Sequence, residues 1–162
     1  MTVSDPGSRV ARVVGAVVLA ALVAAGARPP ARPSINAALL RPGDLLFRTG
    51  DSAHSAAVVA AEGGGWSHVA IVVRSASGGL ELIHASPADA PGEFDGVRRE
   101  SLEAFARHAY AIGAYRPQSE SAAAYAAARA EHYLGRRFDA QLDADSDAEL
   151  YCTELVAEAF RG

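Results

Sequence analysis

The sequence predicts one domain that mixes helices with an antiparallel sheet, and three observations point to it. Residues 66–73 form a continuous run rich in β-branched side chains, which is typical of a buried strand. A turn over 75–79 and a second apolar run over 80–85 complete the pattern of a β-hairpin. After Cys152, apolar residues recur at helical spacing, at positions 155, 156, 159 and 160. A chain of 162 residues is long enough for one such domain.

Composition restricts the classes of partner. Half of the residues are hydrophobic and 21% are charged, as in an ordinary globular protein. The formal net charge is −4, and the 15 basic residues, all arginines, form no basic stripe. Nucleic acid is therefore not a predicted partner. The single cysteine, Cys152, excludes an intramolecular disulfide.

The N-terminal part of the chain does not have the pattern of a folded domain. Arg9 and Arg12 precede an apolar run over 13–25, and a small-x-small triplet ends at Ala27. These features predict a secretory signal peptide that is cleaved after Ala27. The sequence therefore predicts a protein that is secreted or lies in the periplasm or cell envelope.

Two other interpretations of this segment stay open. Residues 10–27 are just long enough for an uncleaved, tilted membrane anchor. The third interpretation is a buried N-terminal helix, but the proline-rich linker over 28–33 argues against it. For a signal peptide or an anchor, residues 1–33 are leader and linker, and residues 34–162 are the folded domain.

The first half of this domain contains alternating turn and apolar signals. Residues 39–47 combine a Pro-Gly-Asp turn with a short apolar strand that follows it. Residues 51–61, rich in alanine and valine, predict a short helix that the glycines at 63–65 end. After the hairpin, residues 88–99 contain glycines, a proline and several charges, which predicts a surface loop.

The second half leads into the cysteine helix. Residues 101–108 predict a short helix with Ser101 as its N-cap, and residues 111–116 predict a third strand. Residues 121–134 are helical by their alanine content, and a glycine follows directly. Residues 138–147 are acidic and irregular, and Asp139 among them is a weak candidate for contact with substrate.

Cys152 is the candidate nucleophile because it lies in the first turn of the predicted helix. Unpaired backbone N–H groups and the positive end of the helix dipole favour a thiolate there. A free cysteine has a pKa of about 8.5, and a helix N-terminus with a nearby histidinium lowers it. The alternative is that Cys152 is a small buried apolar residue, as free cysteines often are.

Two of the five histidines are candidates for a base. His68 begins one strand of the hairpin and His84 ends the other, so both lie at the same edge of the sheet. Cross-strand neighbours are about 5 Å apart, which allows an imidazole pair. The alternative is that each imidazole is satisfied by backbone carbonyls near a strand end. The remaining histidines, interpreted as surface or helix-packing residues, are His54, His108 and His132.

Three sequence blocks together resemble a known family. They are residues 42–47 (PGDLLF), 67–72 (SHVAIV) and 151–155 (YCTEL). In this order they resemble the circularly permuted branch of the NlpC/P60 papain-like superfamily, and its YiiX-like group in particular, over residues 39–160. The resemblance implies a papain-like α+β domain with a small antiparallel sheet, in which the nucleophile helix comes last.

The resemblance also implies roles for individual residues. The nucleophile of the family falls on Cys152, its base on His68 and its third polar position on His84. Relatives often have a glutamate at the third position, but Glu81 lies on the opposite strand face from His84 and is a poor substitute. The implied mechanism is thiol acyl transfer, with backbone N–H groups at the helix start receiving the oxyanion.

Two acidic residues in the matching blocks have structural interpretations. Asp44 is expected to cap a turn, and Glu154 is expected to complement the helix dipole.

The leading hypothesis is a cysteine peptidase or amidase without a cofactor that acts on amide substrates, with cell-wall peptides suggested by analogy. A lipid acyl hydrolase or acyltransferase of the same fold is the enzymatic alternative. A non-catalytic binding module for peptides or amino acids is a second alternative. A zinc site formed by His68, His84 and Cys152 is a third, but no short ligand pair supports it.

Overall fold

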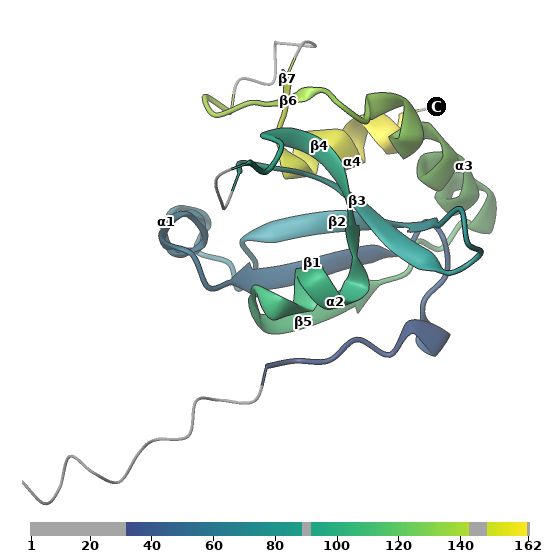
Figure 1. Ribbon diagram of the computed structural model, residues 1–162, viewed down its shortest axis with the longest axis horizontal. Helices are drawn as coiled ribbons and strands as arrows, with labels where there is room; N and C mark the ends of the chain where they lie inside the picture. The colour runs from purple at the N-terminus through teal and green to yellow at the C-terminus, as the bar shows by residue number, and fades with distance from the viewer. Residues whose placement is uncertain (1–31, 89–91, 143–148, 162) are drawn as a thin grey trace, which may run out of the picture. The chain divides into compact units, whose positions relative to one another are not determined.

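The computed structural model describes residues 32–88, 92–142 and 149–161, and among these one mixed sheet has the strand order β5-β1-β2-β3-β4-β6-β7 (Figure 1). The strands are β1 (Leu45–Gly50), β2 (His68–Arg74), β3 (Leu80–Ser86), β4 (Gly96–Ser101), β5 (Ala109–Tyr115), β6 (Arg137–Phe138) and β7 (Glu149–Leu150). The helices are α1 (Ala53–Glu62), α2 (Leu102–Arg107), α3 (Glu120–Ala130) and α4 (Cys152–Phe160), with 3₁₀ turns η1 (Ala37–Leu39) and η2 (Glu131–Tyr133). The α+β class with the cysteine helix last is as predicted.

The predicted leader lies outside the described residues, so the signal peptide and its cleavage after Ala27 stay predictions. Within the described part of the chain, no helix has both the length and the hydropathy that a membrane span requires.

The hairpin that carries the two candidate histidines forms as predicted. β2 and β3 pair antiparallel, with Ile71 opposite Ile83 and Arg74 opposite Leu80. Alternate side chains point to opposite faces of the sheet, so the hairpin contributes to two cores. Val69, Ile71 and Val73 pack with α3 and α4, whereas Ala70, Val72 and Leu82 pack with Phe105 of α2. Figure 1 shows α3 and α4 side by side on one face of the sheet.

The turn before β1 has the structure that its sequence predicts. Gly43 has φ +89°, a conformation that favours glycine, and an added Cβ would lie 2.2 Å from the Ala123 carbonyl oxygen. Asp44 accepts a hydrogen bond from the Arg41 backbone N–H at 2.8 Å, which confirms its turn-capping role. Its carboxylate also accepts two hydrogen bonds from Arg116, at 2.9 and 2.7 Å.

The predicted surface loop over 88–99 is wrong at its end. Residues 96–101 form β4, which pairs with β3 from Glu81↔Ser101 to Ser86↔Gly96. Local signals miss this strand because Val97 is its only large apolar residue. Its polar residues adopt the strand conformation because they pair with β3, which is a non-local effect.

The other predicted helices and strands agree with the structure to within a few residues, whereas η1 and the two-residue strands β6 and β7 were not predicted. Ser101 caps α2 by accepting a hydrogen bond from the Ala104 N–H. The helix predicted over 121–134 ends as α3 at Ala130 and continues as the tighter turn η2. Gly135, at φ +85°, then ends it as expected.

Candidate active site

Cys152 is the first residue of α4, where the chain leaves the short strand β7. Leu155 and Ala159, one and two turns further along, are fully buried in the core beneath the sheet. Glu154 accepts a hydrogen bond from the Tyr151 backbone N–H at 3.4 Å, so its carboxylate serves the helix N-terminus as expected. The helix thus presents its first residue, the cysteine, at the edge of the sheet.

The surroundings of the Cys152 sulfur act on its pKa in opposite directions. Burial raises the pKa of the thiol, and this is the larger effect. Hydrogen bonds from backbone N–H groups, of which that of Val69 has the largest effect, and the charge of Arg48 lower it in part. The lowering of the thiol pKa expected from the helix terminus is therefore outweighed by the partial burial of Cys152. The contact with Val69 also places the sulfur beside the start of β2, where His68 lies.

His68 and His84 form the imidazole pair that the hairpin predicts. The Nε2 atom of His68 lies 2.8 Å from the Nδ1 atom of His84, within hydrogen-bond distance. The ring centroids are 4.9 Å apart and the ring planes are nearly perpendicular, at 81°. His84 is completely buried, and Phe105 of α2 packs against both rings.

Glu100 is a member of the site that the sequence analysis missed. Its Oε2 atom lies 3.3 Å from the Nε2 atom of His84, on the side of the ring away from His68. The residue comes from β4, a strand that was not predicted and whose residues 96–99 were assigned to a loop, so nothing local indicated that Glu100 faces the hairpin. Glu81 is not a substitute, as expected, because it pairs with Arg99 at 2.9 Å instead.

Arg48 contributes a buried positive charge to the same cluster. It lies opposite His68 in the β1–β2 pairing and is 5% exposed. Its Nη1 atom donates a hydrogen bond to the Phe105 carbonyl at 3.3 Å and lies 3.9 Å from Oε2 of Glu100. Its guanidinium lies over the Phe105 ring, 4.5 Å from the centroid.

Burial and charge together keep the two imidazoles neutral. Burial lowers the pKa of His68 well below its ordinary 6.5, and His84, Arg48, Arg98 and His54 lower it further. Burial also lowers the pKa of His84, although the Glu100 carboxylate raises it in part. The pKa of Glu100 is lowered despite its burial, because His84, Arg48 and Arg98 stabilise the carboxylate. Near neutral pH the site is thus a neutral histidine pair beside an ionised glutamate.

A cavity of about 360 Å³ opens onto both Cys152 and His68. About half of the other lining residues are apolar, the rest are mainly serines, Thr153, Arg48 and His54, and none of the described lining residues is acidic. The apolar lining residues are Phe47, Val58, Trp66, Val69, Pro87, Phe138, Leu142 and Tyr151.

His54 is exposed on α1, in agreement with its interpretation as a surface residue, and its side chain also lines this cavity. The sequence spacing between α1 and the hairpin does not reveal that the His54 side chain lies near the cavity. His108 lies away from this cavity wall, 3.6 Å from Asp51. Asp139 is buried and accepts a hydrogen bond from the Gln141 N–H at 2.8 Å, and it is not a lining residue.

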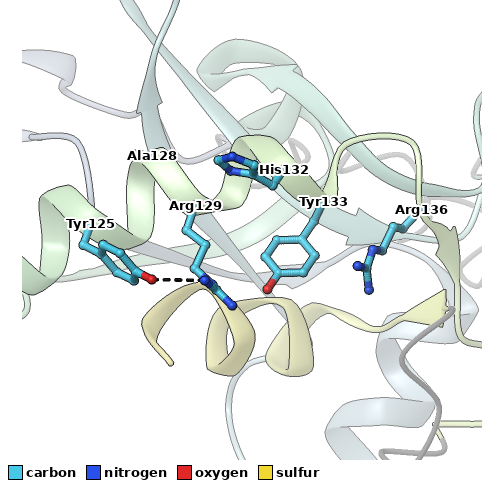
Figure 2. Close-up of a pocket in the computed structure, with 6 residues that line it drawn as sticks. All are labelled: Tyr125, Ala128, Arg129, His132, Tyr133 and Arg136. Atoms are coloured by element: carbon cyan, nitrogen blue, oxygen red, sulfur yellow. Dashed lines mark hydrogen bonds between the residues drawn. The ribbon is translucent and has the colours of Figure 1, made fainter. Parts of the chain in front are cut away.

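A second hollow, of about 300 Å³, lies along α3 and η2 (Figure 2). Arg129 donates hydrogen bonds to the Tyr125 hydroxyl and to the Glu158 carbonyl of α4, each at 3.0 Å. The Arg136 guanidinium lies 4.8 Å from the centroid of the Tyr133 ring. His132 lines this hollow, in agreement with its predicted place at a helix surface. These arginine contacts connect two helices and involve no nucleophile.

The zinc alternative requires His68, His84 and Cys152 to converge on one point. One ring nitrogen of each histidine, Nε2 of His68 and Nδ1 of His84, is taken up by the contact between the two rings. Within residues 32–88, 92–142 and 149–161, no three His, Cys, Asp or Glu side chains are placed to hold a metal ion.

Comparisons with known proteins agree with this architecture. The family described as "permuted papain-like amidase enzyme, YaeF/YiiX, C92 family" matches residues 39–162. The crystal structure of the metalloprotein YiiX from Escherichia coli O157:H7 is similar, with a TM-score of 0.62 and 22% sequence identity. The similarity covers 74% of this chain but only 64% of that chain. The curated proteins give no match.

Proposed function

The chain belongs to the permuted papain-like amidase family, and we propose that it hydrolyses an amide bond through an acyl-enzyme on Cys152. In this proposal His68 is the general base and His84 orients it. The observation that carries the proposal is that Cys152 and His68 share one cavity wall, while Nε2 of His68 is held by His84. The other ring nitrogen of His68, Nδ1, is then left to exchange a proton with the sulfur.

The first half of the reaction transfers the acyl group to the enzyme. Nδ1 of His68 takes the proton of the Cys152 thiol as the sulfur attacks the amide carbon. Backbone N–H groups at the start of α4 stabilise the oxyanion. The C–N bond then breaks, and the proton passes from His68 to the leaving amine.

The second half returns the enzyme to its starting state. His68 takes a proton from water while the oxygen attacks the thioester carbon. The C–S bond breaks, the proton passes to the sulfur, and a carboxylic acid leaves.

The pKa directions favour a neutral resting pair over a preformed thiolate–imidazolium pair. Burial raises the pKa of Cys152 and lowers that of His68, so both changes favour the state in which the sulfur keeps the proton. Proton transfer would then accompany the attack on substrate, which is general-base catalysis.

The composition of the cavity wall supports a substrate with an apolar acyl part. Aromatic side chains such as Phe47, Trp66 and Phe138 gain from contact with apolar groups. The described lining residues include no carboxylate that would pair with the free amine of a cell-wall peptide. We therefore place acylated amines and amino acids ahead of murein peptides, which were first suggested by analogy.

A series of N-acyl p-nitroanilides of increasing chain length tests the proposal. We expect p-nitroaniline release that improves with acyl length, and an acyl adduct on Cys152 detectable by mass spectrometry. His68→Ala should suppress the adduct while the fold, followed by circular dichroism, is kept. A chain that forms no adduct with any acyl group would instead be a binding module. Faster release from murein peptides than from any apolar amide would reverse the substrate assignment.

We also propose that residues 1–33 act as an export leader and linker. The support is the basic, apolar and small-x-small pattern of the sequence. Expression of the full chain in a bacterium, followed by intact-mass measurement, tests this. A mature protein that begins at Arg28 is expected, and an intact N-terminus in the membrane fraction would support the anchor instead.

A further inference from the structure

We propose that Glu100 is a positioning residue that selects the tautomers of both histidines and so leaves Nδ1 of His68 unprotonated toward Cys152. This inference rests on the proposed function only for its catalytic consequence. The tautomers themselves are a property of the resting protein. The contacts that carry it are His68–His84 at 2.8 Å and His84–Glu100 at 3.3 Å.

Counting protons along this chain of contacts leads to one arrangement. An ionised Glu100 can only accept a hydrogen bond, so the facing Nε2 atom of His84 must carry a proton. Nε2 of His84 and Oε2 of Glu100 are buried and lie 3.3 Å apart, without the alignment of a full hydrogen bond and without another hydrogen-bond partner among the described residues, so the carboxylate charge favours an N–H over a lone pair at Nε2. A neutral imidazole carries one N–H, so Nδ1 of His84 is an acceptor. The contact at 2.8 Å then requires Nε2 of His68 to donate, which leaves Nδ1 of His68 with its lone pair.

Without Glu100 the opposite arrangement becomes available. His84 can then carry its proton on Nδ1 and donate to Nε2 of His68, which would move the proton of His68 to Nδ1. In that tautomer Nδ1 of His68 carries a proton, so it could not accept one from the Cys152 thiol as the proposed mechanism requires. The contact between the two histidines alone is compatible with both arrangements.

Two arginines keep Glu100 ionised and thereby maintain its preference for one tautomer of each histidine. Arg48, from β1, lies 3.9 Å from Oε2, and Arg98, on β4 itself, adds a second positive charge. Arg98 is held in place by carbonyl oxygens, including that of Ser86 at 3.2 Å. The carboxylate is mostly buried, with 16% of its side chain exposed, so these charges act with little screening by solvent.

Strand β3, which pairs with β4, offers a matched control for Glu100. Glu81 is also a strand glutamate paired with an arginine, Arg99 at 2.9 Å, but it is solvent-accessible and on the other face. Glu81→Gln therefore makes the same chemical change as Glu100→Gln without touching the histidines.

Long-range ¹H–¹⁵N NMR of histidine-labelled full-length protein at pH 7.5 tests the inference directly. In the wild type and in Glu81→Gln, we expect both imidazoles with the proton on Nε2. In Glu100→Met, which removes the acceptor, we expect a population with the proton on Nδ1. Glu100→Gln keeps the shape and keeps the test available if the methionine variant does not fold, because its amide N–H₂ can donate to His84 and reverse both tautomers. A wild-type His84 with its proton on Nδ1 would overturn the inference, as would unchanged tautomers in every folded Glu100 variant.

Activity gives a second readout. We expect Glu100→Gln to slow acylation of Cys152 by about 10²-fold, less than the loss of about 10⁴-fold known for a wrong tautomer directly beside a catalytic histidine. Glu81→Gln should stay within about twofold. If the tautomers are as stated but no amide is cleaved, the inference stands and the proposed function fails. If amides are cleaved and the Glu100 variants keep the wild-type rate, the inference fails and the proposed function stands.

Discussion

The two hollows of this domain are similar in volume, about 360 and 300 Å³, but differ in what is buried beside them. In each, an arginine lies over an aromatic ring: Arg48 over Phe105 at 4.5 Å, and Arg136 over Tyr133 at 4.8 Å. Arg48 is buried together with two histidines and a glutamate, so the charges shift one another's pKa values. Along α3, the hydrogen bonds of Arg129 hold helices together at the surface. Volume therefore does not distinguish the two hollows, whereas buried titratable groups mark the first one as the candidate active site.

The largest expected effect is on catalysis, and it separates the two hollows. Cys152→Ala should lower the rate of amide hydrolysis by at least about 10³-fold, because the proposed nucleophile is lost. His132→Ala, in the hollow of Figure 2, should stay within about twofold. Rates for both variants on an N-acyl p-nitroanilide provide the comparison. Comparable losses in the two variants would show that the first cavity holds no special chemistry.

The second effect is on stability. Arg48→Met should lower the free energy of unfolding by about 3 kcal/mol, because it removes one of the two cations that stabilise the buried Glu100 carboxylate. Arg129→Met removes a surface arginine and should cost less. Urea denaturation of both variants at pH 7.5 measures the difference. An equal loss would contradict the distinction between a buried and an exposed charge.

The third effect concerns pH. The folded-state pKa values of His68 and His84 lie below 6.5, so the unfolded chain binds protons first as the pH falls. The free energy of unfolding should therefore decrease as the pH drops from about 6.5 toward the lowered values. Glu100 and Asp44, whose pKa values are also lowered, should add a further loss below about 4.5. Urea titrations from pH 8 to 4 should show a smaller first loss in His68→Asn. A stability that rises on acidification would mean that the histidines are charged in the folded state.

The smallest effect tests the apolar wall. The Trp66 ring lies where a side chain at position 113 would stand, since an added Cβ on Gly113 would lie 2.8 Å from it. Trp66→Ala should raise KM for a long-chain N-acyl substrate by about fivefold, through lost apolar contact, with kcat little changed. Tyr125→Ala, beside the other hollow, serves as the control and should leave KM unchanged. An unchanged KM in Trp66→Ala would place the acyl group elsewhere.

The sequence by itself determined the elements that depend on local order. The β-branched run and the turn after it define the β2–β3 hairpin. The hairpin in turn places His68 and His84 close together at the same end of these two strands. Helical spacing after Cys152, with a glutamate two residues on, places the cysteine at the first position of α4. These features need only neighbouring residues, so periodicity and turn chemistry are sufficient to predict them.

Tertiary structure alone decided the rest of the candidate site. Glu100 reaches His84 only because β4, a strand with little apolar character, pairs with β3. Arg48 and His54 join from β1 and α1 through contacts that no local spacing records. The raised pKa of the Cys152 thiol has the same origin, since burial is set by elements far apart in the chain. A sequence pattern shows which side chains share a face, but packing decides which charges meet and how much water remains between them.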